Sequence, residues 1–466
     1  MALPVVNLIN RFNDIAEIFP NELRERALPY FLDWLIDNVM LVEITTFSDD
    51  DAYTIFETMN DRGLSLTPTD MLKGYLLASI KDDESRVQAE DAWKEQMSDL
   101  RELGKDEDAD CMKAWLRSQY AEKIRERKAG AQPEDFDRQG TEFHRWVREN
   151  RNRIGLKNGT DFTLFVTKNL RFFAKAYENA RNAANNYSSE SGLSSIFFNA
   201  QNSFTLQYPL MLAPLRLDDS EEIVQRKMCL VATFVEITLA RRMWNFKAID
   251  HLTMQYRVFL IMKAIRGLEL EALRDDLLQR LSPEGVERDD YIDFKTGEAF
   301  RLHGANGPQV HRLLARLTEF LEVRSGEAPR YPEYANRSSR KGGYQIEHIW
   351  ANHPERHEDE FASAMDFAAY RNRIGGLVLL PAGDNVSYSD KTYEEKVQHY
   401  VKQNLLACSL HPIAYENKPG FRKFREETGL AFEAKSNFRK SDLDERQALY
   451  IKLADHCWSS DRLSKI

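Results

Sequence analysis

Closely paired cysteines and long apolar runs are both missing from this chain of 466 residues. The cysteines are Cys111, Cys229, Cys408 and Cys457. A zinc ribbon or a disulfide framework needs cysteines at short spacings such as C-x-x-C, so their wide separation disfavours both classes and indicates a reducing environment. The longest apolar stretch, residues 228–240, contains Glu236 and is too short to cross a bilayer. We therefore expect a cytoplasmic protein without a membrane segment.

Several nucleotide and metal motifs are absent as well. The sequence contains no G-x-x-x-x-G-K-[ST] loop to hold a nucleotide phosphate and no H-E-x-x-H pair to bind zinc. An excess of positive charge is also missing, because the formal net charge is -10. This balance argues against a protein that coats nucleic acid non-specifically, so any contact with phosphate must come from a confined basic surface.

The sequence predicts a helical body followed by a smaller mixed domain. A chain of 466 residues is too long for one hydrophobic core, so two or three domains are expected. Residues 81–283 have helical apolar spacing almost throughout, and Ser220 begins a long buried helix. Residues 344–350 and 374–380 are strand-like, and a helix is expected at 392–407. The predicted fold class is mainly α, with helical N-terminal and middle regions and a C-terminal α+β domain.

Chemistry-bearing side chains gather around the two expected strands. Glu347 and His348 are neighbours on the first strand, Asn385 follows the second, and Lys396 lies in the first turns of the helix. Strand, strand and helix in this order, with these residues, is the layout of a ββα-metal nuclease. We expect the side chains of Glu347, His348 and Asn385 to converge in one cleft.

Phosphodiester hydrolysis explains why these residue types suit the layout. Water must lose a proton near neutral pH, and histidine can take it because its ordinary pKa is about 6.5. Mg²⁺ prefers oxygen ligands and keeps several waters, so one carboxylate and one amide oxygen suffice to hold it. His348 is therefore the candidate general base, and Glu347 and Asn385 are the candidate metal ligands. From these arguments alone, a Glu-His pair on a strand is more often a surface pair.

The segment from Tyr344 to Tyr400 closely resembles the C-terminal domain of GmrSD-type restriction endonucleases. The shared patterns are Ile346-Glu347-His348-Ile349, Asn372-Arg373-Ile374-Gly375 and Leu377-Val378-Leu379-Leu380, followed by Asn385, Ser389 and Lys396. The last helix, with Glu445-Arg446 and Trp458, is similar to that family's ending, so the resemblance covers about residues 295–466. The resemblance is specific because several separate short patterns recur in the same order.

This resemblance implies an HNH (His-Me finger) nuclease that acts on DNA and uses Mg²⁺ or Mn²⁺. It implies catalytic roles for His348, Asn372 and Lys396, and metal binding by Glu347 and Asn385.

The chain departs from the family at Gly376, where a Gly-Asn-Leu pattern is usual. A middle asparagine commonly orients the general-base histidine in HNH sites. Its loss would weaken catalysis unless Asn372 or a backbone carbonyl takes its place.

The front of the chain resembles the closing part of the GmrSD N-terminal domain. The pattern runs from Ala52-Tyr53 through Ile55-Phe56-Glu57-Thr58-Met59-Asn60-Asp61-Arg62-Gly63 to Leu66-Thr67 and Asp70-Met71-Leu72-Lys73. That domain is ParB-like and is associated with nucleotide hydrolysis, but its D-G-Q-Q-R motif does not occur in this sequence. We expect either a truncated member or half of a split system. Its candidate partner is then a separate ParB-like NTPase subunit or a second copy of the chain, and no residue is assigned to nucleotide binding.

A basic run precedes the first expected strand. Arg337, Arg340 and Lys341 lie in a segment that would ordinarily be only a solvated loop. Next to a nuclease site they are also suited to contact phosphates, so they are the candidate DNA-binding residues.

We expect the end of a GmrSD N-terminal domain at 1–82, a helical domain at 83–290 and an HNH nuclease domain at 291–466. The expected function is cleavage or nicking of foreign or modified DNA in prokaryotic anti-phage restriction. Two alternatives stay open at this point. One is a non-catalytic subunit of a split restriction system, in which Gly376 marks a decayed site. The other is an RNase that uses the same site.

The chain alone is expected to hydrolyse neither GTP nor ATP, because it lacks both the D-G-Q-Q-R motif and a phosphate-binding loop. Phosphate release by the purified chain, with and without DNA, measures this. Robust turnover that disappears in Arg62→Ala would contradict the expectation.

Overall fold

The computed structural model describes residues 3–40, 66–189, 192–285, 292–338, 342–388 and 390–466. The chain divides into two compact units, Met1–Leu66 and Thr67–Ile466. Helix accounts for 65% of the structure, so the expected mainly α class is confirmed. Within the described residues, no helix is long and apolar enough to cross a membrane.

The first unit is a pair of helices connected by short turns. Its elements are α1 (Leu3–Ile18), η1 (Asn21–Leu23), η2 (Glu25–Ala27) and α2 (Leu28–Asn38). The edge of the Phe31 ring meets Phe19 at 5.8 Å between centroids, and Phe31 also stacks on Trp34 at 6.3 Å. No residue of α2 is buried, so much apolar surface stays exposed in this unit.

The second unit begins with a run of packed helices. They are α4 (Pro68–Ala78), α5 (Asp83–Leu103), α6 (Glu107–Tyr120), α7 (Asp135–Thr141), α8 (Phe143–Glu149), α9 (Gly159–Leu164), a π-helix η3 (Phe165–Leu170), α10 (Arg171–Asn185), α11 (Ser194–Gln201), α12 (Gln207–Leu212), α13 (Glu221–Trp244), α14 (His251–Ile265), α15 (Leu270–Leu281) and η4 (Pro283–Gly285). Ser220 caps α13 by accepting a hydrogen bond from the backbone N–H of Ile223, which confirms the long buried helix expected after Ser220. The helix α4 packs on α5, α6 and α8 and so belongs to the second unit. The limits of the three expected domains stay a prediction.

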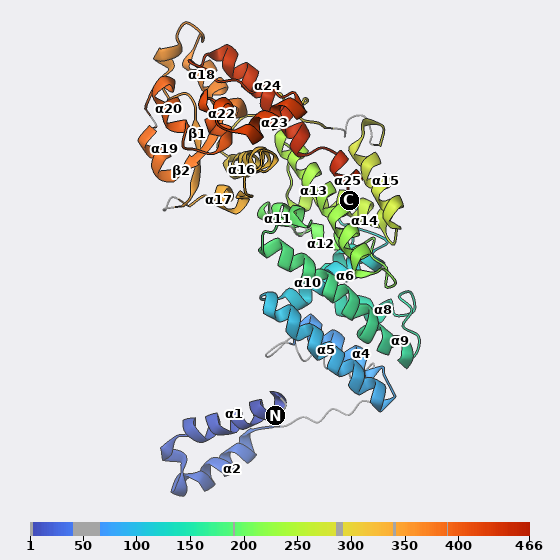
Figure 1. The fold of residues 1–466 in the computed structure, drawn as a ribbon. Helices are drawn as coiled ribbons and strands as arrows, with labels where there is room; N and C mark the ends of the chain where they lie inside the picture. Colours follow the sequence, from blue (N-terminus) through green and yellow to red (C-terminus); the bar gives the residue numbers. More distant parts are fainter. Residues whose placement is uncertain (1–2, 41–65, 190–191, 286–291, 339–341, 389) are drawn as a thin grey trace. The chain divides into compact units, whose positions relative to one another are not determined.

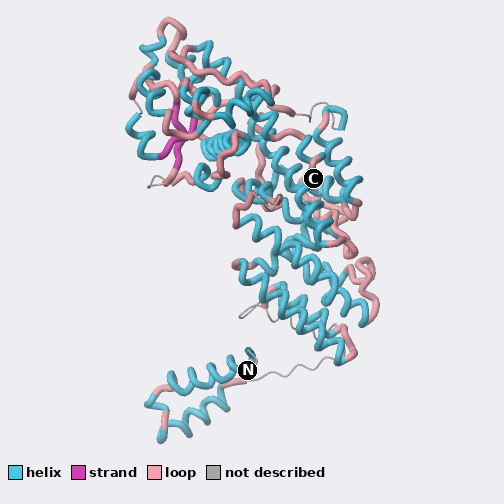
Figure 2. Tube along the Cα trace, in the orientation of Figure 1, coloured by secondary structure: helices cyan, strands magenta, loops and turns pink. Residues whose placement is uncertain are grey.

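The C-terminal part of the second unit contains both strands (Figures 1 and 2). Its elements are α16 (Gly307–Arg324), α17 (Tyr331–Ala335), β1 (Tyr344–His348), η5 (Pro354–His357), α18 (Ala364–Arg371), η6 (Ile374–Gly376), β2 (Leu377–Pro381), α19 (Ala382–Tyr388), α20 (Tyr393–Tyr400), α21 (Leu405–Cys408), α22 (Ile413–Glu416), α23 (Pro419–Thr428), α24 (Lys440–Cys457) and α25 (Asp461–Ser464). The core beneath β1 and β2 includes Trp350, Val378, Tyr400 and Leu443.

The two strands form an antiparallel pair in which Tyr344 lies opposite Pro381 and His348 opposite Leu377. Several expected boundaries were wrong. The first strand ends at His348, two residues before its expected end. The second strand begins at Leu377 because residues 374–376 form a short 3-10 turn. The helix expected to reach residue 407 ends at Tyr400, and α21 is a separate short helix capped by the Asn404 side chain.

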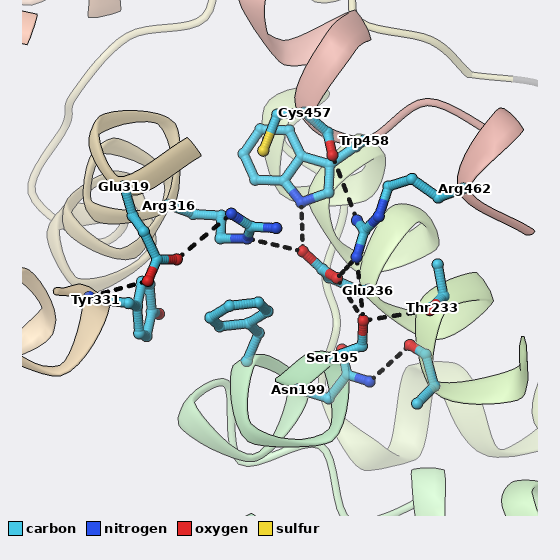
Figure 3. A network of polar contacts seen from close by, with 12 residues as sticks. Ser195, Asn199, Thr233, Glu236, Arg316, Glu319, Tyr331, Cys457, Trp458 and Arg462 are labelled. Atoms are coloured by element: carbon cyan, nitrogen blue, oxygen red, sulfur yellow. Dashed lines mark hydrogen bonds and ion pairs between the residues drawn. The ribbon is translucent and has the colours of Figure 1, made fainter. Parts of the chain in front are cut away.

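A buried carboxylate, Glu236 of α13, joins the first helices of the second unit to its C-terminal part (Figure 3). The Glu236 side chain is only 4% exposed. Its Oε2 accepts hydrogen bonds from Ser195 Oγ and from Arg462 Nη2, each at 2.7 Å. Its Oε1 accepts from Arg316 Nε and from Trp458 Nε1, each at 3.1 Å. These donors lie on α11, α16, α25 and the residue after α24, so one carboxylate connects five segments of the chain.

The electrostatic balance at Glu236 favours the ionised form. Burial alone would raise the pKa of the carboxyl, but the charges of Arg462 and Arg316 outweigh burial and lower the pKa to about 2. The carboxylate therefore stabilises the fold above its ordinary pKa of 4.5, and this contribution is lost as the pH falls toward 2.

Glu236→Gln is expected to lower the free energy of unfolding by about 2–4 kcal/mol at neutral pH, because two partly buried guanidinium groups lose their anion. Chemical denaturation at neutral pH and at about pH 3 measures the effect, and the difference from wild type should shrink at the lower pH. Glu222→Gln, an exposed residue on the same helix, serves as the control and should leave stability unchanged. Equal stability of Glu236→Gln and wild type at neutral pH would contradict the expectation.

Candidate functional site

The candidate site lies at the end of β1, where Glu347 and His348 are the last two residues of the strand. Two local features fix this end. The backbone N–H of Ile349 donates to Gly376 O at 2.9 Å, which extends the pairing beyond the strand. The short turn that contains Gly376 packs on α24, so this helix supports the end of the strand.

His348 is held by Asn372, the residue that terminates α18. The imidazole Nε2 lies 2.8 Å from Asn372 Oδ1. Burial lowers the pKa of His348 to about 4, with a further contribution from the charge of Arg371, so the imidazole is neutral at neutral pH. An amide oxygen can only accept, so Nε2 carries the proton and Nδ1 keeps its lone pair. The arrangement leaves one ring nitrogen able to take a proton from water.

Glu347 faces Lys396 of α20 inside the domain. Their side chains are 6% and 1% exposed, and the Lys396 Nζ lies 2.6 Å from Glu347 Oε1. The same ammonium donates to the backbone carbonyl of His348 at 2.8 Å. Burial raises the pKa of Glu347 and lowers that of Lys396, while each partner's charge opposes the shift of the other. Lys396 thus compensates the carboxylate and fixes the backbone of the candidate base.

Asn385 lies on α19 and contacts β1 near its start. Its Nδ2 donates to Gln345 Oε1 at 3.0 Å. Gln345 and Glu347 are two residues apart on the strand, so their side chains lie on the same face. Among the described residues, no hydrogen bond or ion pair joins Asn385 to Glu347 or His348. The structure therefore places Asn385 on the Glu347 side of the strand but not in direct contact with the other two, and the expected convergence on one cation stays a prediction.

The oxygen atoms available to a cation are few. In the described residues, no group of three or more His, Cys, Asp or Glu side chains could hold a metal ion. Asn385 Oδ1 is buried and has no hydrogen-bond partner in the part of the chain that the structure describes. Glu347 Oε1 meets the Lys396 ammonium at short range but not with hydrogen-bond geometry. A cation here would need the amide oxygen and the carboxylate together, with water in the remaining positions.

Gly376 stands where the family pattern has asparagine, and its surroundings leave little room for a side chain. A Cβ at this position would lie 3.2 Å from the carbonyl oxygen of Arg371 and 3.2 Å from Leu443 Cδ1. The Nε2–H of His348 donates instead to Asn372 Oδ1.

Sequence reasoning did not single out Arg371, the residue before Asn372. Its Nε donates to Trp350 O at 3.0 Å, and its charge lowers the pKa values of His348 and Lys396. No motif marks this position, and the only signal in the sequence was its adjacency to the Asn-Arg-Ile-Gly pattern.

The other predicted residues are only partly described. Arg337 is exposed between α17 and β1, while Arg340 and Lys341 lie outside the described residues. Ser389 and residues 52–65 of the front resemblance also lie outside them. Thr67 and Asp70 form a reciprocal capping box with Pro68 at the first helical position of α4.

Comparison with known families gives two matches. Residues 286–453 match the family described as GmrSD restriction endonucleases, C-terminal domain. Residues 5–77 match the family described as GmrSD restriction endonuclease, N-terminal domain. No curated protein matches the chain. The first match spans β1, β2 and α20 and so contains all the candidate catalytic and metal-binding residues.

Gly376→Ala is expected to lower the free energy of unfolding by about 1–3 kcal/mol, because its methyl group would crowd a backbone carbonyl and Leu443. Thermal unfolding measures this. Gly383→Ala is the matched control, because a Cβ there meets nothing within 4 Å. If Gly376→Asn were as stable as wild type, the crowding described here would be wrong.

Proposed function

Because this chain belongs to the GmrSD restriction endonuclease family, we propose that its C-terminal domain is a metal-dependent HNH endonuclease that cleaves or nicks DNA. The observation that carries this proposal is the neutral His348 imidazole at the end of β1, with Asn372 Oδ1 at 2.8 Å from its Nε2. The family match supports the nuclease role, and the hairpin with its following helices supports the HNH subtype.

In this proposal His348 accepts a proton from the attacking water at Nδ1. Asn372 keeps the ring in the required tautomer, because its amide oxygen accepts from Nε2–H. Lys396 holds the carbonyl of His348 and so limits movement of the strand end. The low pKa of His348 makes it a weak base, and a nearby phosphate anion would raise that pKa toward neutrality.

We propose Mg²⁺, or Mn²⁺ in its place, as the cofactor, with Asn385 and Glu347 as its protein ligands. The buried Asn385 Oδ1 without a hydrogen-bond partner suits an oxygen-preferring cation. The bound ion would stabilise negative charge on the phosphate and on the leaving oxygen. Until it binds, Lys396 supplies the positive charge that the buried Glu347 carboxylate needs.

We propose foreign or modified DNA as the substrate and anti-phage restriction as the biological role. The family match supports the restriction role, and the substrate follows from it. A separate ParB-like NTPase subunit stays the proposed partner, and Arg337, Arg340 and Lys341 stay the proposed DNA contacts.

His348→Ala should reduce DNA cleavage by about 10²–10⁴-fold while leaving the fold intact, because it removes the general base. Plasmid nicking with Mg²⁺, with EDTA and with RNA offered in parallel measures activity, metal dependence and substrate class. Arg373→Met, outside the proposed site, is the control variant. Cleavage by His348→Ala at the wild-type rate, with matched melting curves, would remove the proposed role. Cleavage of RNA alone would favour the RNase alternative, and no cleavage by wild type would favour the non-catalytic subunit.

A further inference from the structure

Arg371 is a cation beside the candidate site, and the carboxylate whose charge acts on it, Glu347, is already paired with Lys396. Arg371 is partly buried, and among the described residues no carboxylate forms an ion pair with it. Its Nε donates to Trp350 O at 3.0 Å. Its two terminal nitrogens have no hydrogen-bond partner in the described part of the chain and are not enclosed. Partly buried guanidinium groups normally have their donors satisfied, so this group has free capacity for a ligand.

The neighbouring arginines show the contrast. Arg373, two residues further on, pairs with Asp444 at 2.9 Å and lies 3.8 Å from the centre of the Tyr370 ring. Arg446 is buried and donates through Nη2 to Leu406 O at 2.7 Å and to Tyr450 OH at 3.1 Å. The terminal guanidinium nitrogens of Arg373 and Arg446 thus bind other residues, whereas those of Arg371 do not within the residues described.

The charge of Arg371 acts on the site itself. It favours the deprotonated forms of Glu347, His348 and Lys396, whose pKa values it lowers. Glu347 and Lys396 cancel each other as an ion pair, and the buried His348 ring is neutral. Arg371 therefore adds positive charge at the end of β1, as Arg356 also does near Lys396, and this charge suits an anion.

The position of Arg371 is rigid. It is the last residue of α18, directly before Asn372, which contacts the candidate base. Its carbonyl oxygen packs against Gly376, and its Nε is bound to the backbone two residues beyond His348. A guanidinium held in this way would bind a ligand through its terminal nitrogens without a large loss of side-chain freedom.

We propose that Arg371 binds the phosphodiester group of the DNA strand that is cut, through its terminal guanidinium nitrogens. This inference rests on the proposed nuclease function and adds a substrate-binding residue to it. Arginine suits this role because its planar fork can donate two parallel hydrogen bonds to phosphate oxygens. It would place the anion beside His348, where the water is activated.

Binding can be tested separately from cleavage. In full-length chain carrying His348→Ala, fluorescence anisotropy with a labelled DNA duplex gives Kd across a range of salt concentrations. Adding Arg371→Met should raise Kd about 10-fold and reduce the slope of log K against log salt by about 1, because one phosphate contact is lost. Adding Arg373→Met instead should leave the slope unchanged, because Asp444 already neutralises that charge. An unchanged slope for Arg371→Met would overturn the proposal.

Stability provides the second measurement. Arg371→Met should lower Tm by only about a few degrees, because it breaks no ion pair and loses a single hydrogen bond, from Nε to Trp350 O. In otherwise wild-type enzyme it should lower kcat/KM for DNA, and Arg371→Lys should recover only part of the loss because an ammonium cannot make the paired contact. A much larger fall in Tm that accompanies the loss of binding would show a structural role and overturn the proposal. Loss of binding to RNA alone would overturn the assignment to DNA. Failure of the His348→Ala parent to bind either nucleic acid would show instead that the proposed function itself is wrong.

Discussion

The buried Glu236 carboxylate is the constraint on which the second unit depends most. It receives hydrogen bonds from α16, through Arg316, and from the residue that follows α24, through Trp458. These same two helices support the hairpin, because α16 packs on β2 and α24 packs on the turn before β2. The end of β1 is therefore held in place through contacts that lead back to Glu236 of α13. Glu236 lies about 110 residues before Glu347 in the sequence.

Charge in the candidate site is arranged as a neutral pair with one cation beside it. Glu347 and Lys396 are both buried and pair with each other, while His348 is neutral because burial and Arg371 lower its pKa. Such a site is poor in negative charge compared with sites that hold metals through several carboxylates. It is better suited to receive an anion than to retain a cation by itself, so substrate and metal would be expected to assist each other's binding.

Local signals predicted the parts of the fold that depend on local chemistry. The helix that begins at Ser220 and the two strands followed from short-range patterns. The length of the helix after Thr392 did not, because its end at Tyr400 depends on tertiary packing. For the site, the sequence named Glu347, His348, Asn372, Asn385 and Lys396, whose roles stay predictions. The Lys396 contact to the His348 carbonyl, the Gln345 partner of Asn385 and the free guanidinium of Arg371 arise from approaches between distant segments, which no spacing rule encodes.

The way the last helices are anchored determines how the nuclease domain could be excised from the chain. The C-terminal family match ends at residue 453, inside α24 (Lys440–Cys457). A fragment trimmed to that match would lose Trp458 and Arg462, which supply two of the four donors to Glu236. It would also lose Glu236 itself, and Arg316 would then be left buried without its main anion. The residues that match the family and the residues needed for independent folding therefore differ in this protein. A fragment that folds on its own is expected to extend well beyond the family match.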